Sequence, residues 1–135
     1  MIIGTGIDII KNSRIKKLLE TFGWRLLNKI FSSQEIIVLS QKFDVNNLSQ
    51  PKLINYVAKR FAGKEAFAKA TGFGIGGIFG FADIEIINDG FGKPNIFLGK
   101  SKQNLFTNKF GLTNIHLSLS DEKEYSVAMV IIEKI

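Results

Sequence analysis

Two carboxylates stand in apolar surroundings and are the first candidates for chemistry. Asp8 lies inside the apolar run of residues 1–10, and Glu65 follows Phe61 by about one helical turn, beside a face expected to be buried. A carboxylate at the edge of a core is costly unless it is paired, hydrogen-bonded or bound to a metal ion. Because Mg²⁺ takes few oxygen ligands from a protein and keeps room for water and phosphates, the two form a candidate Mg²⁺ site.

Each carboxylate also has a purely structural explanation. Lys69 follows Glu65 by four residues, so the two share a helix face and can form a solvated ion pair worth about 0.3–0.5 kcal/mol. Asp8 can equally cap a strand end or belong to a turn. The residue pattern alone leaves both explanations open.

Basic side chains gather on the same predicted helix as Glu65. They are Lys59, Arg60, Lys64 and Lys69, and Arg60 and Lys64 lie one turn apart. Together with a metal ion held by carboxylates they would suit a diphosphate, since cations form strong hydrogen bonds with phosphate oxygens. A solvated basic face is the alternative.

The charge distribution points to an anionic partner or substrate. The net charge is +6, and residues 1–70 carry 12 basic and 5 acidic side chains, whereas residues 71–135 carry 6 and 7. A basic half favours a nucleotide, a nucleic acid or an acidic protein, although such a surface can also serve solubility alone. The absence of cysteine excludes disulfides and thiolate chemistry, and a single histidine, His116, excludes a multi-histidine zinc site.

The segment Gly72–Gly77 matches the letters of the dinucleotide fingerprint G-x-G-x-x-G. That fingerprint requires a strand before it and a helix after it, whereas here a helix is predicted before and a strand after. We therefore reject a dinucleotide site and expect a loop that closes on a ligand or a tight helix-to-sheet crossover.

The segment 113–120 alternates between apolar and polar residues. His116, Ser118 and Ser120 share one side of the predicted strand. They can line a polar pocket or simply face solvent, and no nucleophile elbow for a catalytic triad is visible.

The chain predicts one α+β domain over residues 1–135, with a mostly antiparallel sheet packed against a long helix. The long helix runs from Pro51 to about Ala70, and its alanines at 58, 62, 66 and 70 form a ridge that allows close packing, as against a sheet. The other expected helices are 12–22, capped by Asn12 or Ser13, then 24–30, 33–43 with Ser32 and Glu35 as a capping box, and 101–110. The expected strands are 2–10, 82–88, 95–98, 113–120 and 125–132.

Over nearly its whole length, the chain resembles the holo-[acyl-carrier-protein] synthase family, the small 4′-phosphopantetheinyl transferases. The resemblance rests most strongly on residues 60–70, RFAGKEAFAKA, followed by Gly74–Gly76. The other matching segments, in chain order, are Gly6–Ile9, Arg14-Ile15, Phe31-Ser32 leading to Glu35, Asp83–Ile86, Asn88-Asp89, Gly92–Pro94 and Ser118–Ser120.

The resemblance implies a reaction and a set of site residues. The family moves 4′-phosphopantetheine from coenzyme A to a serine of apo-acyl carrier protein, with Mg²⁺, releases 3′,5′-ADP and supports fatty acid synthesis. Asp8 and Glu65 match the metal ligands, with Glu65 also taking the serine proton and Lys69 stabilising the transferring phosphoryl group. The residues that match coenzyme A contacts are Arg60, Lys64, Lys69, Gly92, Lys93, Pro94 and Ser118, and Asp121 is a further candidate contact.

The resemblance also implies partners. Arg14, Lys17 and Arg25 match the basic surface that meets the acidic carrier protein, in agreement with the basic N-terminal half. Family members are homotrimers with active sites between protomers, which would give the apolar sheet and the alanine ridge something to pack against. Since no targeting or membrane-spanning segment stands out, a cytoplasmic location without a membrane partner is expected.

Two positions depart from the family pattern. Many relatives have a histidine just after the Ser-x-Ser/Thr strand end, where this chain has Asp121, so any role of that histidine is lost or taken by the carboxylate. Gly63 weakens the long helix by about 0.5–1 kcal/mol relative to alanine, next to a presumed ligand.

Two other functions remain as alternatives. One is a small basic nucleic-acid-binding module. The chain has no motif in which aromatic residues that stack on bases alternate with basic ones, so nucleic acid is not an expected partner. The other is a non-catalytic homologue that binds coenzyme A without transfer, which the intact Asp8, Glu65 and Lys69 argue against and Asp121 keeps open.

Overall fold

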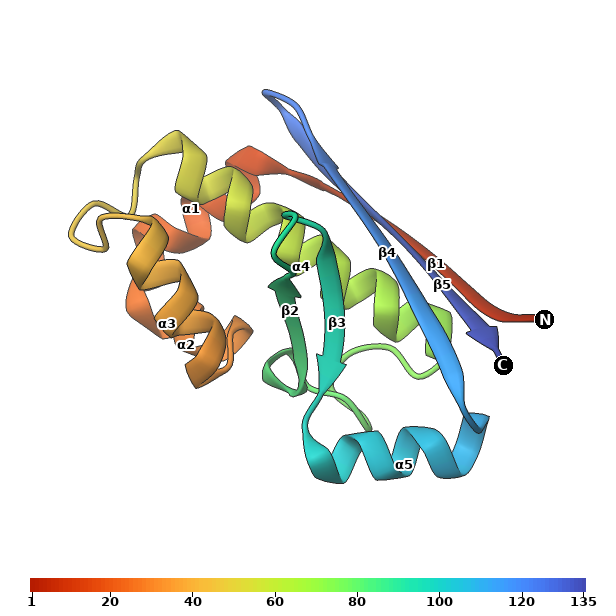
Figure 1. The fold of residues 1–135 in the computed structure, drawn as a ribbon. Helices are drawn as coiled ribbons and strands as arrows, with labels where there is room; N and C mark the ends of the chain where they lie inside the picture. Colours follow the sequence, from red (N-terminus) through yellow and green to blue (C-terminus); the bar gives the residue numbers. More distant parts are fainter.

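The long helix α4 (Pro51–Thr71) packs against one face of a three-stranded antiparallel sheet in the order β1-β5-β4 (Figure 1). The computed structural model describes residues 1–135, and in it β5 lies between β1 and β4, so that these two form the sheet edges. A separate hairpin of β2 and β3 lies against α4 and β4. The α+β class with an antiparallel sheet on a long helix is confirmed, although the strands form two sheets.

The remaining elements follow the predicted bounds closely. The strands are β1 Ile2–Lys11, β2 Ile84–Asn88, β3 Pro94–Leu98, β4 Thr113–Asp121 and β5 Tyr125–Lys134. The helices are α1 Asn12–Phe22, α2 Trp24–Ile30, α3 Ser33–Lys42, α5 Lys100–Phe110 and the 3₁₀ turn η1 Phe81–Asp83. That turn occupies Ala82 and Asp83, which were expected in the strand. No helix combines the length and apolar composition needed to cross a membrane.

Glycines in β1 allow the strand to touch the backbone of α4. A Cβ atom placed on Gly4 or Gly6 would collide with the carbonyl group of Ala70 or Ala66. The predicted alanine ridge therefore does pack against a sheet, and it finds that partner within its own chain rather than in another protomer.

Gly63 has a packing reason nearer the β4 edge of the sheet. A Cβ atom there would lie 2.7 Å from Cδ1 of Ile86 and 3.2 Å from Cδ2 of Leu119. The glycine therefore lets the β2–β3 hairpin and β4 approach the helix, which outweighs its lower helix propensity.

A side chain caps the N-terminal end of α3 but not that of α1, although the sequence predicted a cap for both. The capping box is confirmed, because Ser32 Oγ accepts from the Glu35 amide at 3.2 Å and Glu35 Oε1 accepts from the Ser32 amide at 3.1 Å. The cap predicted at Asn12 or Ser13 is wrong. The buried Asn12 instead donates to the carbonyls of Glu122 and Lys123 and accepts from Ser126, which fastens the turn between β4 and β5.

The Gly72–Gly77 segment follows a helix and leads through a loop to η1 and β2, so the rejection of a dinucleotide fingerprint is confirmed. Gly72 ends α4 with a left-handed φ of 83°, a conformation that favours glycine.

We predict that Gly6→Ala destabilises the protein by about 3 kcal/mol or more, because neither backbone in the contact can move without separating β1 from α4. Urea unfolding of Gly6→Ala and Gly77→Ala measures this difference. Gly77 has open space around its Cβ position and serves as the control. Equal stability of the two variants would show that the close approach is not required.

Candidate active site

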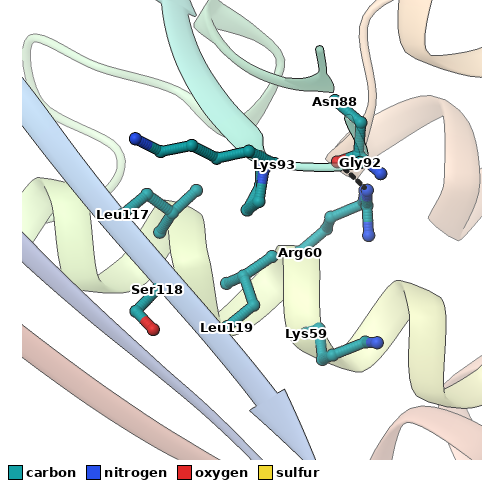
Figure 2. Close-up of a pocket in the computed structure, with 9 residues that line it drawn as sticks. Lys59, Arg60, Asn88, Gly92, Lys93, Leu117, Ser118 and Leu119 are labelled. Carbon is teal, nitrogen blue, oxygen red and sulfur yellow. Dashed lines mark hydrogen bonds between the residues drawn. The ribbon is translucent and has the colours of Figure 1, made fainter. Parts of the chain in front are cut away.

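A hollow of about 340 Å³ opens at the β4 edge of the sheet, between α4, the β2–β3 hairpin and β4 (Figure 2). It is lined by Lys59, Arg60, Asn88, Gly92, Lys93, Pro94, Leu117, Ser118 and Leu119. The structure thus brings together five residues expected to contact coenzyme A, namely Arg60, Gly92, Lys93, Pro94 and Ser118. Three cations and no carboxylate line this basic hollow, an arrangement that suits a phosphorylated ligand.

Arg60 is the most constrained cation of the basic hollow. Its side chain is buried, its guanidinium lies 3.7 Å from the centre of the Tyr56 ring, and its Nη2 donates to Asn88 Oδ1 at 3.1 Å. Its buried Nε has no hydrogen-bond partner in the protein. Burial lowers the pKa of Arg60, and attraction to Tyr56 and Glu35 opposes that shift. The ring of Tyr56 and the amide of Asn88 therefore hold the guanidinium in a fixed position at the hollow.

The hairpin turn that supplies Gly92 and Lys93 is held by a residue that the sequence analysis did not single out as a site residue. The Asp89 carboxylate accepts from the amides of Phe91 at 2.8 Å and Lys93 at 3.0 Å, and these bonds lower its pKa. Which backbone amides the turn brings to the Asp89 carboxylate is a property of the folded hairpin and cannot be read from the sequence. On β4, the hydroxyl of Ser118 points to the side opposite Leu117 and Leu119 (Figure 2).

Asp8, Glu65 and Lys69 form a second cluster, at the β1 edge of the sheet. Lys69 Nζ donates to Asp8 Oδ1 at 2.8 Å and to the Ile7 carbonyl at 3.1 Å, so Lys69 pairs with Asp8 rather than with Glu65. Burial and then the charge of Asp8 raise the pKa of Glu65, whereas Lys69 and Arg14 lower it. Asp8 and Glu65 are therefore close enough to repel each other.

This pair of carboxylates fits a Mg²⁺ ion. It offers hard oxygen ligands whose mutual repulsion a cation would relieve. A cation held here would keep most of its coordination positions for water and substrate oxygens, as Mg²⁺ commonly does.

The assignment of Lys64 to a phosphate contact is contradicted by the structure. Its side chain is completely buried, and Nζ donates to Glu35 Oε1 at 2.6 Å and to the carbonyls of Ile30 at 2.7 Å and Phe81 at 3.0 Å. These bonds use all three hydrogens of the ammonium. Burial lowers the pKa of Lys64 and raises that of Glu35, and their mutual attraction opposes both shifts.

Asp121 is paired with Lys59, one of the cations that line the basic hollow. Its carboxylate forms an ion pair with Lys59 at 3.2 Å and accepts from Asn55 Nδ2 at 3.0 Å. It lines an adjoining hollow of about 290 Å³, which shares Lys59 with the basic hollow. Asp121 therefore reaches the basic hollow through Lys59 and does not line it.

A third depression, the docking groove, lies on the far side of α4 from the basic hollow and has a volume of about 310 Å³. Its apolar floor comes from Leu18, Phe22, Leu26, Ile30, Phe61 and Phe81, and its cations are Arg14, Arg25 and Lys29. Arg14 and Arg25 were predicted to meet a carrier protein, whereas Lys29 was not. The third predicted residue, Lys17, is exposed on α1 and does not line the groove.

The polar residues of β4 lie on the open face of the sheet. His116, Ser118 and Ser120 are exposed, and His116 Nε2 lies 3.0 Å from Glu133 Oε2. This contact lowers the pKa of Glu133. Of the two explanations for the alternation, a strand with one solvent-facing side is confirmed for His116 and Ser120.

Comparison with known proteins identifies the family. The 4′-phosphopantetheinyl transferase superfamily model matches residues 4–130. The chain belongs to this superfamily. It is 42% identical to the holo-[acyl-carrier-protein] synthase of Serratia proteamaculans, with 98% of each chain covered.

Solved structures show the same superfamily fold. The holo-[acyl-carrier-protein] synthase of Neisseria meningitidis has a TM-score of 0.86 and 39% identity, covering 99% of this chain and 100% of its own. The enzyme from Bacillus anthracis, in complex with CoA (3′,5′-ADP), has a TM-score of 0.77 and 38% identity, covering 98% and 97%. This transferase chain is therefore similar to holo-[acyl-carrier-protein] synthases from end to end.

The interaction between the two carboxylates can be measured directly. We predict that Asp8→Asn lowers the pKa of Glu65, by removing a repelling charge, and that Lys69→Met raises it, by removing an attracting one. Carboxyl-carbon NMR titration reads both values, with Glu133 as an internal reference that stays unchanged. A Glu65 pKa that does not respond to Asp8→Asn would mean that the pair does not share a site.

Proposed function

We propose that this chain is a Mg²⁺-dependent holo-[acyl-carrier-protein] synthase, which transfers 4′-phosphopantetheine from coenzyme A to apo-acyl carrier protein and so supports fatty acid synthesis. The observation that carries the proposal is the meeting of Asp8, Glu65 and Lys69 at one sheet edge, in a chain similar to such synthases over its whole length. The relative from Bacillus anthracis in complex with CoA (3′,5′-ADP) supports coenzyme A as the substrate.

The basic hollow holds the nucleotide end of coenzyme A. Arg60, fixed by Tyr56 and Asn88, presents its guanidinium to a phosphate oxygen, while Lys59 and Lys93 add positive charge at the rim. The backbone of Gly92–Pro94 forms a wall at which a ligand can approach closely. Cations held in fixed positions lose little freedom on binding, which favours a diphosphate over a neutral ligand.

Asp8 and Glu65 would hold Mg²⁺, which would supply positive charge to the diphosphate and its leaving group. Glu65 carries the proton chemistry, because Lys69 pairs with Asp8 and leaves Glu65 as the carboxylate of the cluster that no lysine neutralises. The serine oxygen of the carrier protein attacks the phosphorus that bears pantetheine, and its proton passes to Glu65, directly or through a water molecule. The bond from that phosphorus to the bridging oxygen breaks, and 3′,5′-ADP leaves. Lys69 stabilises the charge on the transferring phosphoryl group.

The carrier protein docks at the groove between α1, α2 and α4. The apolar floor and the arginines of the groove match a carrier helix that has an apolar ridge flanked by acidic side chains. Attraction between the acidic side chains and the arginines mainly makes association faster and sensitive to salt.

The active form is a homotrimer, with sites between protomers. In one chain, the carboxylates lie at the β1 edge of the sheet and the basic hollow at the β4 edge, with β5 between them. The sheet face turned away from α4 exposes Ile7 (64%), Ile9 (65%) and Met129 (45%) to solvent. A closed ring of copies covers this apolar face and brings unlike edges of neighbouring chains together.

The reaction is tested by intact-mass measurement of apo-acyl carrier protein after incubation with coenzyme A and Mg²⁺. We expect a mass gain of one phosphopantetheine that is lost with a chelator and reduced about 100-fold or more in Glu65→Gln, because the base is removed. Glu124→Gln, in the exposed turn between β4 and β5, is the control and stays active. Coenzyme A binding without any transfer would instead identify a non-catalytic homologue.

The assembly is tested by light scattering. We predict three times the single-chain mass for the wild type and the single-chain mass for Ile7→Glu, since a charge on the covered face opposes association. Leu112→Glu is the matched control, because Leu112 is 70% exposed but lies outside that face. A wild type with the mass of one chain would contradict the trimer.

A further inference from the structure

A buried ammonium lies directly behind the docking groove. The acceptors of Lys64 belong to three elements outside its own helix: the Glu35 carboxylate on α3, the Ile30 carbonyl at the end of α2 and the Phe81 carbonyl in η1. With no exposed surface, Lys64 contacts neither solvent nor the basic hollow. Its position is not explained by coenzyme A binding.

Two of these acceptors belong to residues that form the groove itself. The side chains of Ile30 and Phe81 line the groove, and their carbonyl groups bind Lys64 from behind. Phe61, on the same helix as Lys64, stacks on Phe81 with ring centroids 5.1 Å apart. The ammonium therefore sets the distance of the groove walls from α4.

Glu35 extends the same junction to β2. Its second oxygen, Oε2, accepts from the Ile86 amide at 3.1 Å, and Ser32, the cap of α3, donates to Glu85 at 2.7 Å. Lys64 is also followed directly by Glu65 on α4. The junction thus connects the walls of the docking groove with the helix that carries the proposed base.

We infer that Lys64 is a positioning residue for the carrier protein, which holds the docking groove in register with Glu65. The inference rests on the proposed function and adds a role for a residue that touches neither substrate. Without the ammonium, the carbonyls of Ile30 and Phe81 lose their common donor, and α2 and η1 can shift relative to α4. The carrier serine then reaches Glu65 in fewer of the docked complexes.

The test compares Lys64→Met with Glu35→Gln. Both variants break the ion pair, but glutamine at position 35 still offers Lys64 an oxygen and leaves the bonds to Ile30 and Phe81 in place. Melting temperatures, the KM for each substrate and the emission of Trp24, at the start of α2, are measured for both. Trp24 is the only tryptophan of the chain, so its emission reports on α2 alone.

We expect both variants to melt at a lower temperature, and only Lys64→Met to raise the KM for the carrier protein, by about tenfold, equivalent to about 1.4 kcal/mol. In Lys64→Met the KM for coenzyme A stays within about twofold of the wild type, and the Trp24 emission shifts. The inference is wrong if the KM for the carrier protein rises in both variants in proportion to their loss of melting temperature. It is also wrong if Lys64→Met leaves the KM for the carrier protein unchanged.

Two controls separate this inference from the proposed function. Lys109→Met makes the same chemical change on α5, away from the groove, and leaves all values unchanged, whereas Arg25→Glu weakens docking directly. A wild type that transfers nothing refutes the proposed function, whereas an active wild type with an unaffected Lys64→Met refutes only the positioning role. If Lys64→Met does not fold, Lys64→Met/Glu35→Leu replaces it, since it leaves no unpaired buried charge and still lacks the bonds to both carbonyls.

Discussion

The contact between strand β1 and helix α4 is the constraint on which the site depends. Gly4 and Gly6 let the strand backbone meet the carbonyls of Ala70 and Ala66, and no larger residue fits at either position. Because side chains on one face of a strand recur every second residue, the next position facing α4 is Asp8. The close approach therefore brings Asp8 to Lys69 and within electrostatic range of Glu65.

The same packing explains why one chain holds its functional groups apart. Helix α4 presents Glu65 and Lys69 at the β1 edge and Arg60 at the β4 edge, and β1 already covers Ala66 and Ala70 of its alanine ridge. What remains uncovered is the outer face of β1 and β5, which is apolar, next to the polar outer face of β4. Association of copies would bury this apolar face and would bring the carboxylates of one chain next to the basic hollow of its neighbour.

Local signals in the sequence predicted the bounds of the elements well, because the Ser32–Glu35 capping box and the alternation of apolar and polar residues are short-range effects. Five of the nine residues that line the basic hollow were also predicted, through the family resemblance, which identifies positions even where geometry is unknown. The partners of Lys64 could not be predicted from the sequence. Lys64 lies one turn from Arg60 on a basic helix, and only the tertiary structure shows that Glu35 and two carbonyls enclose it. Asn12 and Asp89 are similar, since their partners are set by which turn the chain brings to them.

The buried pair of Lys64 and Glu35 is a costly way to join helices. Removing two charges from water carries a penalty that apolar residues of similar volume would avoid, so stability alone does not account for it. An apolar junction, however, is not directional, whereas an ammonium with three acceptors fixes the positions of α2, α3 and η1 relative to α4. Such precision matters most where a partner is docked by one surface and its serine must reach a base on another element. Because small displacements reduce productive encounters strongly, a rigid polar junction behind the groove is worth its desolvation penalty.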